Sequence, residues 1–242
     1  MRLLTSALLG AAGFSHAFPE RGLVDADLCA ALGVPSIVQV KQIHGARVVE
    51  ASQAAGAEAD AIVARPRMSP RSPERSPRTA AGVRVADCVP ILLGDEASGA
   101  VAAIHAGWRG VVAGVVRAGA LFLAGDPEGD ASPERLVRPS AVVAAIGPCI
   151  GACCFEVGAD VADAIERACA SGAVVARRDG SKAFVDLRAA VRAQLVALGI
   201  DPSRVDDVGG CTKHEADRFH SFRRDGQNSG RMLAAIATRS YA

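Results

Sequence analysis

Short runs rich in Val and Ile alternate along this chain with segments whose apolar residues recur at the helical period. The runs end at Gly or Pro, as strands do, and occupy residues 36–40, 82–93, 99–105 and 141–146. Amphipathic helices are predicted over 157–168, over 187–198 with Asp186 as N-cap, and from Gly110 to about Leu123. Because strands alternate with helices, the sequence predicts an α/β domain.

The length and charge of the chain limit the classes of function. Half of the 242 residues are hydrophobic, which is enough for one large α/β domain over residues 1–242. A net charge of +1 gives no global basic field, and 4% aromatic residues are too few for a single-strand-binding platform. No run reaches the ~20 apolar residues of a membrane-spanning helix. We therefore expect neither nucleic acid nor a membrane as a partner.

The cysteines bear on the compartment. Seven cysteines, an odd number at ordinary density, favour reduced thiols and a cytoplasmic location over a disulfide scaffold. Residues 1–17 offer a competing interpretation, because Met-Arg, a short apolar run and Ser15-His16-Ala17 form a passable signal-peptide pattern. The alternative for the same residues is a buried first strand followed by a loop.

Residues 65–78 differ in composition from the rest of the chain. They contain five Arg and four Pro, so they cannot bury apolar area and are predicted to form a mobile insertion. Such a segment could also touch a polyanion, but five basic groups without aromatic residues make that the weaker interpretation.

Two of the five histidines lie in turn-like contexts at the ends of predicted strands. They are His44 in Gln-Ile-His-Gly and His105 in His-Ala-Gly-Trp, and strand ends are where sites collect in α/β folds. Cys88 lies within a predicted strand. A regular strand would point Asp87 and Cys88 to opposite faces, unless Pro90 marks a bulge.

One thiolate and two neutral imidazoles make a good three-ligand zinc site. Three protein ligands leave a fourth position for water, as in catalytic zinc centres. His44, Cys88 and His105 are therefore the candidate metal ligands and catalytic residues. Their spacing fits no short zinc motif, so the competing interpretation is a half-buried cysteine with two hydrogen-bonded histidines.

Five strings of residues occur in a characteristic order over residues 36–238. They are Lys-Gln-Ile-His-Gly (41–45), Ala-Asp-Cys-Val-Pro-Ile-Leu-Leu (86–93), His-Ala-Gly-Trp-Arg-Gly (105–110), Ile-Gly-Pro-Cys-Ile-Gly-Ala-Cys-Cys-Phe-Glu-Val-Gly (146–158) and Phe-His-Ser-Phe-Arg-Arg-Asp-Gly with a later Gly-Arg-Met (219–232). The chain thereby resembles the YfiH-like family, also called the laccase-domain or polyphenol oxidoreductase family. It departs from the family at residues 13–22, which lack a second glycine, and at the insertion 65–78.

The resemblance implies a single α/β domain of layered α-β-β-α type with mixed sheets. It also implies a zinc site made by His44, Cys88 and His105. The implied activity is that of a purine nucleoside phosphorylase acting on adenosine, inosine, guanosine or methylthioadenosine, or of an adenosine deaminase. Its partners would be a small-molecule nucleoside and phosphate. An older association of the family is copper-dependent polyphenol oxidation, which makes copper the alternative metal.

Two arginines near these strings are candidates for binding substrate. Arg109 follows the His105 turn and precedes a predicted helix, where a helix N-terminus and a guanidinium would together bind phosphate. A salt-bridged surface position is the alternative. Arg223 is the second candidate, whereas a structural role is favoured for Arg224.

The remaining cysteines and histidines carry weaker signals. Cys149, Cys153 and Cys154 match no standard zinc or iron–sulfur spacing, so we expect them to be packed thiols. His214 and His220 show no partner and are expected at the surface.

Three other functions stay open at this point. A copper oxidase could use the same trio, although five scattered histidines cannot supply a multicopper centre. A cysteine hydrolase in peptidoglycan-precursor editing would use Cys88 as nucleophile and a histidine as base. The chain could also be a non-catalytic binder. A deaminase would further need a general acid or base, for which Glu156 and Asp87 are the candidates.

Overall fold

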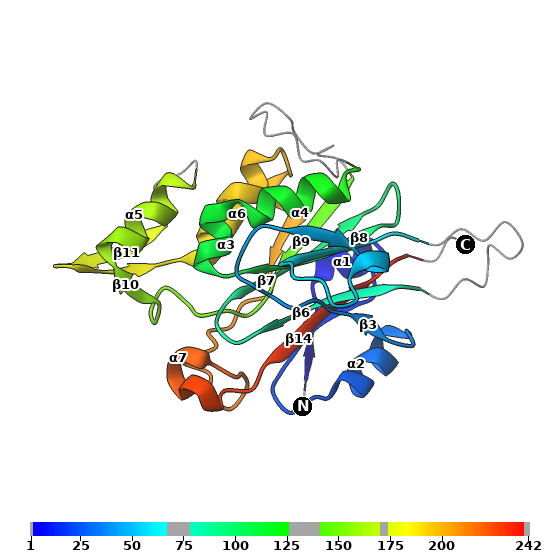
Figure 1. The fold of residues 1–242 in the computed structure, drawn as a ribbon, viewed down its shortest axis with the longest axis horizontal. Coiled ribbons are helices and arrows are strands. Elements are labelled where there is room, and N and C mark those ends of the chain that lie inside the picture. The colour runs from blue at the N-terminus through cyan, green and yellow to red at the C-terminus, as the bar shows by residue number, and fades with distance from the viewer. Residues whose placement is uncertain (1, 67–77, 126–140, 170–173, 240–242) are drawn as a thin grey trace, which may run out of the picture.

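Two mixed sheets lie face to face at the centre of the molecule (Figure 1). The computed structural model describes residues 2–66, 78–125, 141–169 and 174–239. The first sheet has the order β1 (Leu3–Leu4), β2 (His16–Pro19), β14 (Met232–Ala237), β6 (Ala80–Val85) and β3 (Ile37–Val38). The second has the order β13 (Val205–Asp207), β9 (Val142–Ile146), β7 (Val89–Asp95), β8 (Val101–Ala106), β5 (Ala61–Ala64) and β4 (Val48–Glu50).

Helices cover the outer face of each sheet. In Figure 1, α3 (Trp108–Ala113), α4 (Val115–Leu123) and α6 (Leu187–Ala197) lie along the second sheet, while α2 (Asp25–Leu32) covers the first. The helix α1 (Ala7–Ala11) contacts β9 and β13. A small third sheet, β10 (Glu156–Gly158), β12 (Lys182–Val185) and β11 (Val175–Asp179), packs with α5 (Ala159–Arg167). The short α7 (Phe222–Asp225) precedes β14.

The side-chain period of the strands builds these layers. Successive residues of a strand point to opposite faces. Each strand of the second sheet therefore contributes side chains both to the core between the sheets and to the core under the helices. Leu92 and Ala103 pack between the sheets against Phe18. Their neighbours Ile91 and Ile104 face the helices instead. Helix, sheet, sheet and helix therefore follow one another, and the expected layered α-β-β-α fold with mixed sheets is confirmed.

Two predicted elements are each divided in two by the backbone. The predicted strand 82–93 is β6 followed by β7, because Asp87 adopts a φ of 92° between them. Cys88 therefore lies at the crossing from one sheet to the other, and its placement within a regular strand was wrong. The helix predicted from Gly110 begins earlier, at Trp108, and is interrupted where Gly114 has a φ of 85°.

Other predicted elements agree with the structure or need adjustment. The helix α6 begins as expected, since the Asp186 carboxylate accepts a hydrogen bond from the Ala189 N–H at 2.9 Å. The first 17 residues contain β1, α1 and the start of β2, so the alternative of one strand and a loop was incomplete. No helix in the described ranges is long and apolar enough to cross a membrane.

The predicted insertion 65–78 lies largely outside the described residues, which resume at residue 78 after residue 66. Both of its terminal arginines are held by the fold. Arg65 donates to the Glu50 carboxylate at 2.7 Å and to the Phe122 carbonyl at 2.7 Å. Arg78 donates to the Ser15 hydroxyl at 2.7 Å.

Candidate functional site

Three candidate ligands from distant parts of the sequence meet at one end of the two central sheets. His44 lies on the connection from β3 to β4, Cys88 on the connection from β6 to β7, and His105 near the end of β8. Their ligand atoms all lie within 4.8 Å of one another. The two imidazole rings meet edge to face, with centroids 4.8 Å apart and an interplanar angle of 81°.

The strand register explains why His105 and Cys88 converge. In the β7–β8 pair, Pro90 lies opposite His105, so Cys88 follows closely beyond the end of the ladder. His105 shares a face with Ala103, which packs between the sheets. The imidazole is therefore presented where the space between the two sheets opens, and its side chain is only 3% exposed.

The turns that carry the other two ligands have unusual backbones. His44 has a φ of 59° and Asp87 a φ of 92°, and within the described ranges no other non-glycine residue has a positive φ. Such conformations cost about 1–3 kcal/mol each and cluster at functional sites. Hydrogen bonds hold both turns: the His44 N–H donates to Asp60 at 2.9 Å, and the Thr212 hydroxyl donates to Asp87 at 2.7 Å.

Asp60 is a fully buried carboxylate that organises the site. It accepts hydrogen bonds from His105 Nδ1 at 2.8 Å and from the Gly45 N–H at 2.6 Å, in addition to the bond from His44. Burial would raise the pKa of Asp60, but these hydrogen bonds outweigh burial and lower it. Because Nδ1 of His105 donates to a carboxylate, Nε2 is left to face Cys88, which is the arrangement common behind metal-binding histidines.

The charge states of Cys88 and His105 are coupled. Burial would raise the pKa of Cys88, yet hydrogen bonds from His105 and His44 lower it to about 6. Burial would lower the pKa of His105, yet its hydrogen bonds to Asp60 and Cys88 raise it to about 9. The protein without metal therefore favours a thiolate beside an imidazolium at neutral pH.

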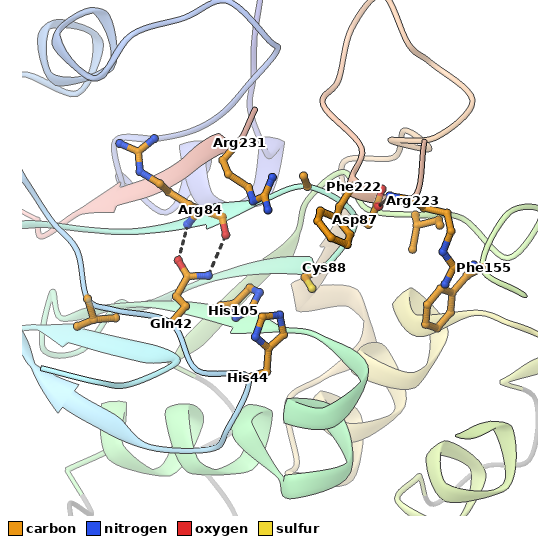
Figure 2. A pocket seen from close by; sticks show the side chains of 13 residues that line it. Gln42, His44, Arg84, Asp87, Cys88, His105, Phe155, Phe222, Arg223 and Arg231 are labelled. Carbon is orange, nitrogen blue, oxygen red and sulfur yellow. Dashed lines mark hydrogen bonds between the residues drawn. The ribbon is translucent and has the colours of Figure 1, made fainter. Parts of the chain in front are cut away.

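A cleft of about 520 Å³ opens above these three residues. Figure 2 shows His44, Cys88 and His105 together, with arginine and aromatic side chains around them. The guanidinium of Arg223 lies 5.3 Å from the centre of the Phe155 ring, and that of Arg231 lies 5.5 Å from the centre of the Phe222 ring. Phe222 lines the cleft and is 44% exposed, so its ring is accessible to a bound molecule.

Gln42 ties the His44 loop to the first sheet. Its side-chain amide donates to the Arg84 carbonyl and accepts from the Arg84 N–H, both at 2.8 Å (Figure 2). The His44 loop is thus fixed to β6 through Gln42 and to the start of β5 through Asp60. The His44 imidazole is therefore preorganised as a metal ligand.

The predicted arginines take different positions. Arg223 lines the cleft, whereas Arg109 lies outside it, exposed, with its guanidinium 4.6 Å from the centre of the Trp108 ring. Arg224 makes two 2.8 Å bonds to Asp225 and donates to backbone carbonyls, as a structural residue does. The cleft also contains Arg231, which the sequence interpretation missed.

The two candidate acid–base groups also differ. Asp87 lines the cleft and accepts hydrogen bonds from Thr212 and from the Arg223 N–H at 2.6 Å. The Glu156 carboxylate lies outside the cleft and pairs with Lys182 at 3.5 Å. Asp60 was not identified from the sequence at all. The sequence did contain an indication of its role. A carboxylate directly before the apolar run Ala-Ile-Val-Ala must either be exposed to solvent or accept hydrogen bonds from nearby donors.

The expectations for the other cysteines and histidines were partly wrong. Cys149 and Cys154 are buried as expected, but Cys153 is exposed and its Sγ lies 3.3 Å from His214 Nδ1. His214 is exposed as expected, yet it has this partner, which sequence spacing alone did not reveal. His220 is half-buried rather than at the surface.

Gly107 leaves just enough space for the ligands. A Cβ atom at this position would lie 3.0 Å from Cys88 Sγ and 3.0 Å from His44 Cδ2, while the backbone φ of −73° would accept alanine. We expect Gly107→Ala to weaken metal binding by about tenfold by displacing both ligands, without unfolding the protein. Chelator competition measures this effect. Gly10→Ala is the matched control, since a Cβ there meets nothing within 4 Å, and equal affinities for the two variants would contradict the geometry.

The layered fold and the Cys-His₂ cluster together define a candidate metal-binding protein of the α-β-β-α class. Residues 24–239 match the family described as multi-copper polyphenol oxidoreductase laccase. The chain belongs to this family, the YfiH-like family, and the resemblance inferred from its five strings is confirmed.

Relatives within the family have names that bear on function. Adenosine deaminase RL5 from an unidentified prokaryote is 40% identical over 161 residues, which are 64% of this chain and 56% of that protein. A purine nucleoside phosphorylase of Bacteroides thetaiotaomicron is 39% identical over 167 residues, 67% of this chain and 58% of that protein. The matched part of the chain thus spans little more than half the length of either relative.

The fold also matches a solved structure of the family. The crystal structure of Neisseria meningitidis protein NMB0706 has a TM-score of 0.68 and 34% sequence identity, and the match covers 88% of this chain and 79% of that one.

Proposed function

We propose that this protein is a zinc-dependent purine nucleoside enzyme that carries out phosphorolysis, deamination or both. The observation that carries the proposal is the convergence of His44, Cys88 and His105 at the base of a cleft lined by arginine and phenylalanine. The names of the relatives, adenosine deaminase and purine nucleoside phosphorylase, support the same substrate class.

The three donors fit a catalytic zinc ion. One sulfur and two ring nitrogens within 4.8 Å of one another match the borderline-soft preference of Zn²⁺. His44 is exposed and Cys88 half-buried, so the side of the cluster that lacks a protein ligand faces the cleft. Zinc bound here would supply a Lewis acid with one position open to substrate. Asp60 would keep His105 in the ligating tautomer.

The walls of the cleft fit a purine nucleoside and an anion. Phe222, which is 44% exposed, offers a ring on which a purine can stack. Arg223 and Arg231 supply positive charge, and in the described part of the chain neither guanidinium is paired with a carboxylate, so both are available for phosphate. Arg84 is committed to Asp25 at 2.5 Å. Arg109 lies outside the cleft and has no part in this proposal.

Asp87 is the acid–base group that we assign to the cleft. It is the one carboxylate among the described residues that line the cleft, and it neighbours Cys88 in the chain. Its hydrogen bonds from Thr212 and Arg223 fix its orientation. In this proposal it accepts a proton from the nucleophile or returns one to the nucleobase.

The test is a nucleoside panel with and without inorganic phosphate. Adenosine, inosine, guanosine and methylthioadenosine are incubated with zinc-loaded protein, and products are identified by mass spectrometry. If the reaction is phosphorolysis, we expect the free base and the 1-phosphate of ribose, or of methylthioribose from methylthioadenosine, only with phosphate. If it is deamination, we expect inosine from adenosine with or without phosphate. In parallel, copper-loaded protein is incubated with a phenolic substrate, which tests the copper oxidase alternative. No product from any nucleoside would refute the proposal.

A second candidate function is supported by one specific observation. Cys88, His105 and Asp60 form a thiol–imidazole–carboxylate series, and the pKa of Cys88 is lowered to about 6. This is the geometry of a cysteine hydrolase, in which the thiolate attacks and the imidazolium protonates the leaving group. Metal and nucleophile roles for one sulfur exclude each other, so the metal content of the active form decides between them.

A further inference from the structure

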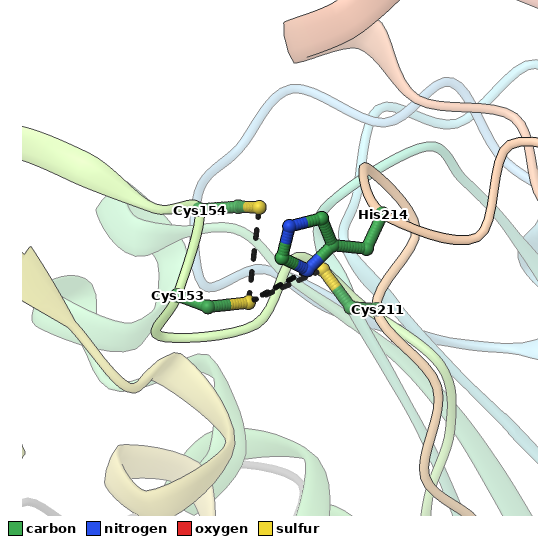
Figure 3. Close-up of side chains that lie close together, drawn as sticks. All are labelled: Cys153, Cys154, Cys211 and His214. Carbon is green, nitrogen blue, oxygen red and sulfur yellow. Dashed lines mark hydrogen bonds between the residues drawn. The ribbon is translucent and has the colours of Figure 1, made fainter.

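A second group of metal-ligating side chains lies outside the three-residue cluster. Cys153 and Cys154 lie on the turn between β9 and β10, and Cys211 and His214 lie on the segment that leads to α7. Figure 3 shows the four side chains pointing toward one another. Their ligand atoms all lie within 4.8 Å of one another. We name these four residues the Cys₃His cluster.

The distances from Cys153 Sγ to the other three ligand atoms of the Cys₃His cluster are close to the edges of a coordination tetrahedron. Zinc–sulfur bonds of about 2.3 Å at tetrahedral angles place two sulfurs about 3.8 Å apart, and a sulfur and an imidazole nitrogen about 3.5 Å apart. Cys153 Sγ lies 3.7 Å from Cys154 Sγ and 3.8 Å from Cys211 Sγ. It lies 3.3 Å from His214 Nδ1.

We propose that Cys153, Cys154, Cys211 and His214 form a second metal site, which binds a structural Zn²⁺. Four protein ligands with three thiolates make a closed tetrahedral set, and such sets hold zinc without leaving a position for substrate. The three-residue cluster at the cleft differs, because it offers only His44, Cys88 and His105. The chain would therefore bind one open and one closed zinc ion.

The surroundings of the Cys₃His cluster are suited to an incoming cation. Cys153 and His214 are exposed, which leaves a path for entry, while Cys154 is buried and Cys211 half-buried. The Gly151 N–H donates to Cys211 Sγ at 3.3 Å, so a backbone dipole already favours the thiolate there. Binding would release the thiol protons and leave His214 neutral.

A closed zinc here would join two walls of the cleft. Cys154 directly precedes Phe155 in one wall. The segment with Cys211 and His214 leads to Phe222 and Arg223 in the other. In the protein alone, these segments are connected by a few hydrogen bonds, among them the one from the Thr212 N–H to the Cys149 carbonyl at 3.0 Å. The ion would therefore fix the spacing of the two aromatic walls.

The test is metal content by elemental analysis after reduction and dialysis against dilute ZnCl₂. We expect about two zinc ions per chain in the wild type and about one in Cys153→Ser, Cys211→Ser and Cys88→Ser. Cys29→Ser is the matched control and should keep both, because Cys29 lies on α2. Circular dichroism checks that each variant is folded, and we expect Cys153→Ser to leave the core intact because Cys153 is exposed.

Cobalt substitution identifies the ligands independently of activity. With Co²⁺ in place of zinc, wild type should show the strong visible absorption of a thiolate-rich tetrahedral site, and Cys153→Ser should lose most of it while Cys88→Ser retains most. If Cys153→Ser and Cys211→Ser bind as much zinc as wild type, the proposal is wrong. A disulfide within the cluster that persists in the metal-loaded protein also overturns it. Loss of zinc in Cys88→Ser alone would overturn this proposal and leave the proposed function standing.

Discussion

Replacing Cys88 with serine is expected to lower nucleoside turnover by more than ~100-fold and to remove the zinc ion at the cleft. Changes in residues that only support a metal ligand already cost ~10–100-fold, and Cys88 contributes the sole sulfur of its cluster. A serine hydroxyl stays protonated at neutral pH and is a poor ligand for zinc. Steady-state kinetics and metal content of the same sample provide the measurement, with Cys29→Ser as the control.

Alkylation of Cys88 separates a ligand from a nucleophile. In metal-free protein the lowered pKa of about 6 predicts that iodoacetamide reacts faster as the pH rises through 6 and levels off above it, because the thiolate fraction is then complete. Peptide mass spectrometry follows Cys88 apart from the exposed Cys153. Zinc should protect Cys88 and restore turnover. Rapid alkylation of Cys88 in zinc-loaded, active protein would instead favour the cysteine hydrolase.

Asp60→Asn is expected to lower the free energy of unfolding by about 2 kcal/mol or more and to weaken zinc binding by ~10–100-fold. Asp60 is fully buried and accepts from donors at both of its oxygens. An asparagine has the same shape but can accept on one side only, so its amide nitrogen would face a backbone N–H or the His105 ring. Chemical denaturation of metal-free protein and chelator competition measure the two effects.

Glu58→Gln is the matched control for Asp60→Asn. It removes a carboxylate two residues away, and this carboxylate is exposed and paired with Lys41 at 2.6 Å. Surface ion pairs of this kind contribute little to stability. If the two variants unfold and bind zinc alike, Asp60 has no organising role and the metal geometry must depend on other contacts.

The sequence predicted the fold where side-chain period and caps act locally. The stripe of α6 and its cap at Asp186 needed no distant partner to be recognised. The break at Asp87 was not recognised, because a positive φ in an aspartate depends on hydrogen bonds from Thr212 and Arg223, which are far away in the sequence. Residues 82–93, rich in Val, Ile and Leu, therefore looked like one strand.

The candidate site, too, could be predicted only where its residues form a local pattern in the sequence. Residue types and the family strings led to His44, Cys88 and His105, and the structure brings their ligand atoms within 4.8 Å. Asp60 was missed because a lone acid carries no pattern of its own. Arg231 lies within the Gly-Arg-Met string, but nothing in that string indicated that it lines the cleft. The Cys₃His cluster was missed because its two halves lie about sixty residues apart and become neighbours only through the β9–β13 pairing and the loops that follow these strands.

Two of the three cleft ligands lie on chain segments that pass from one central sheet to the other. The geometry of the three ligands therefore depends on how the two sheets pack against each other. A small slide or rotation of one sheet would move His44 and Cys88 relative to His105, which belongs to the second sheet alone. Apolar residues that do not line the cleft, such as Leu92 and Phe18, thereby acquire an indirect influence on metal affinity. Evolution could adjust metal affinity by repacking the interior without changing any residue that lines the cleft.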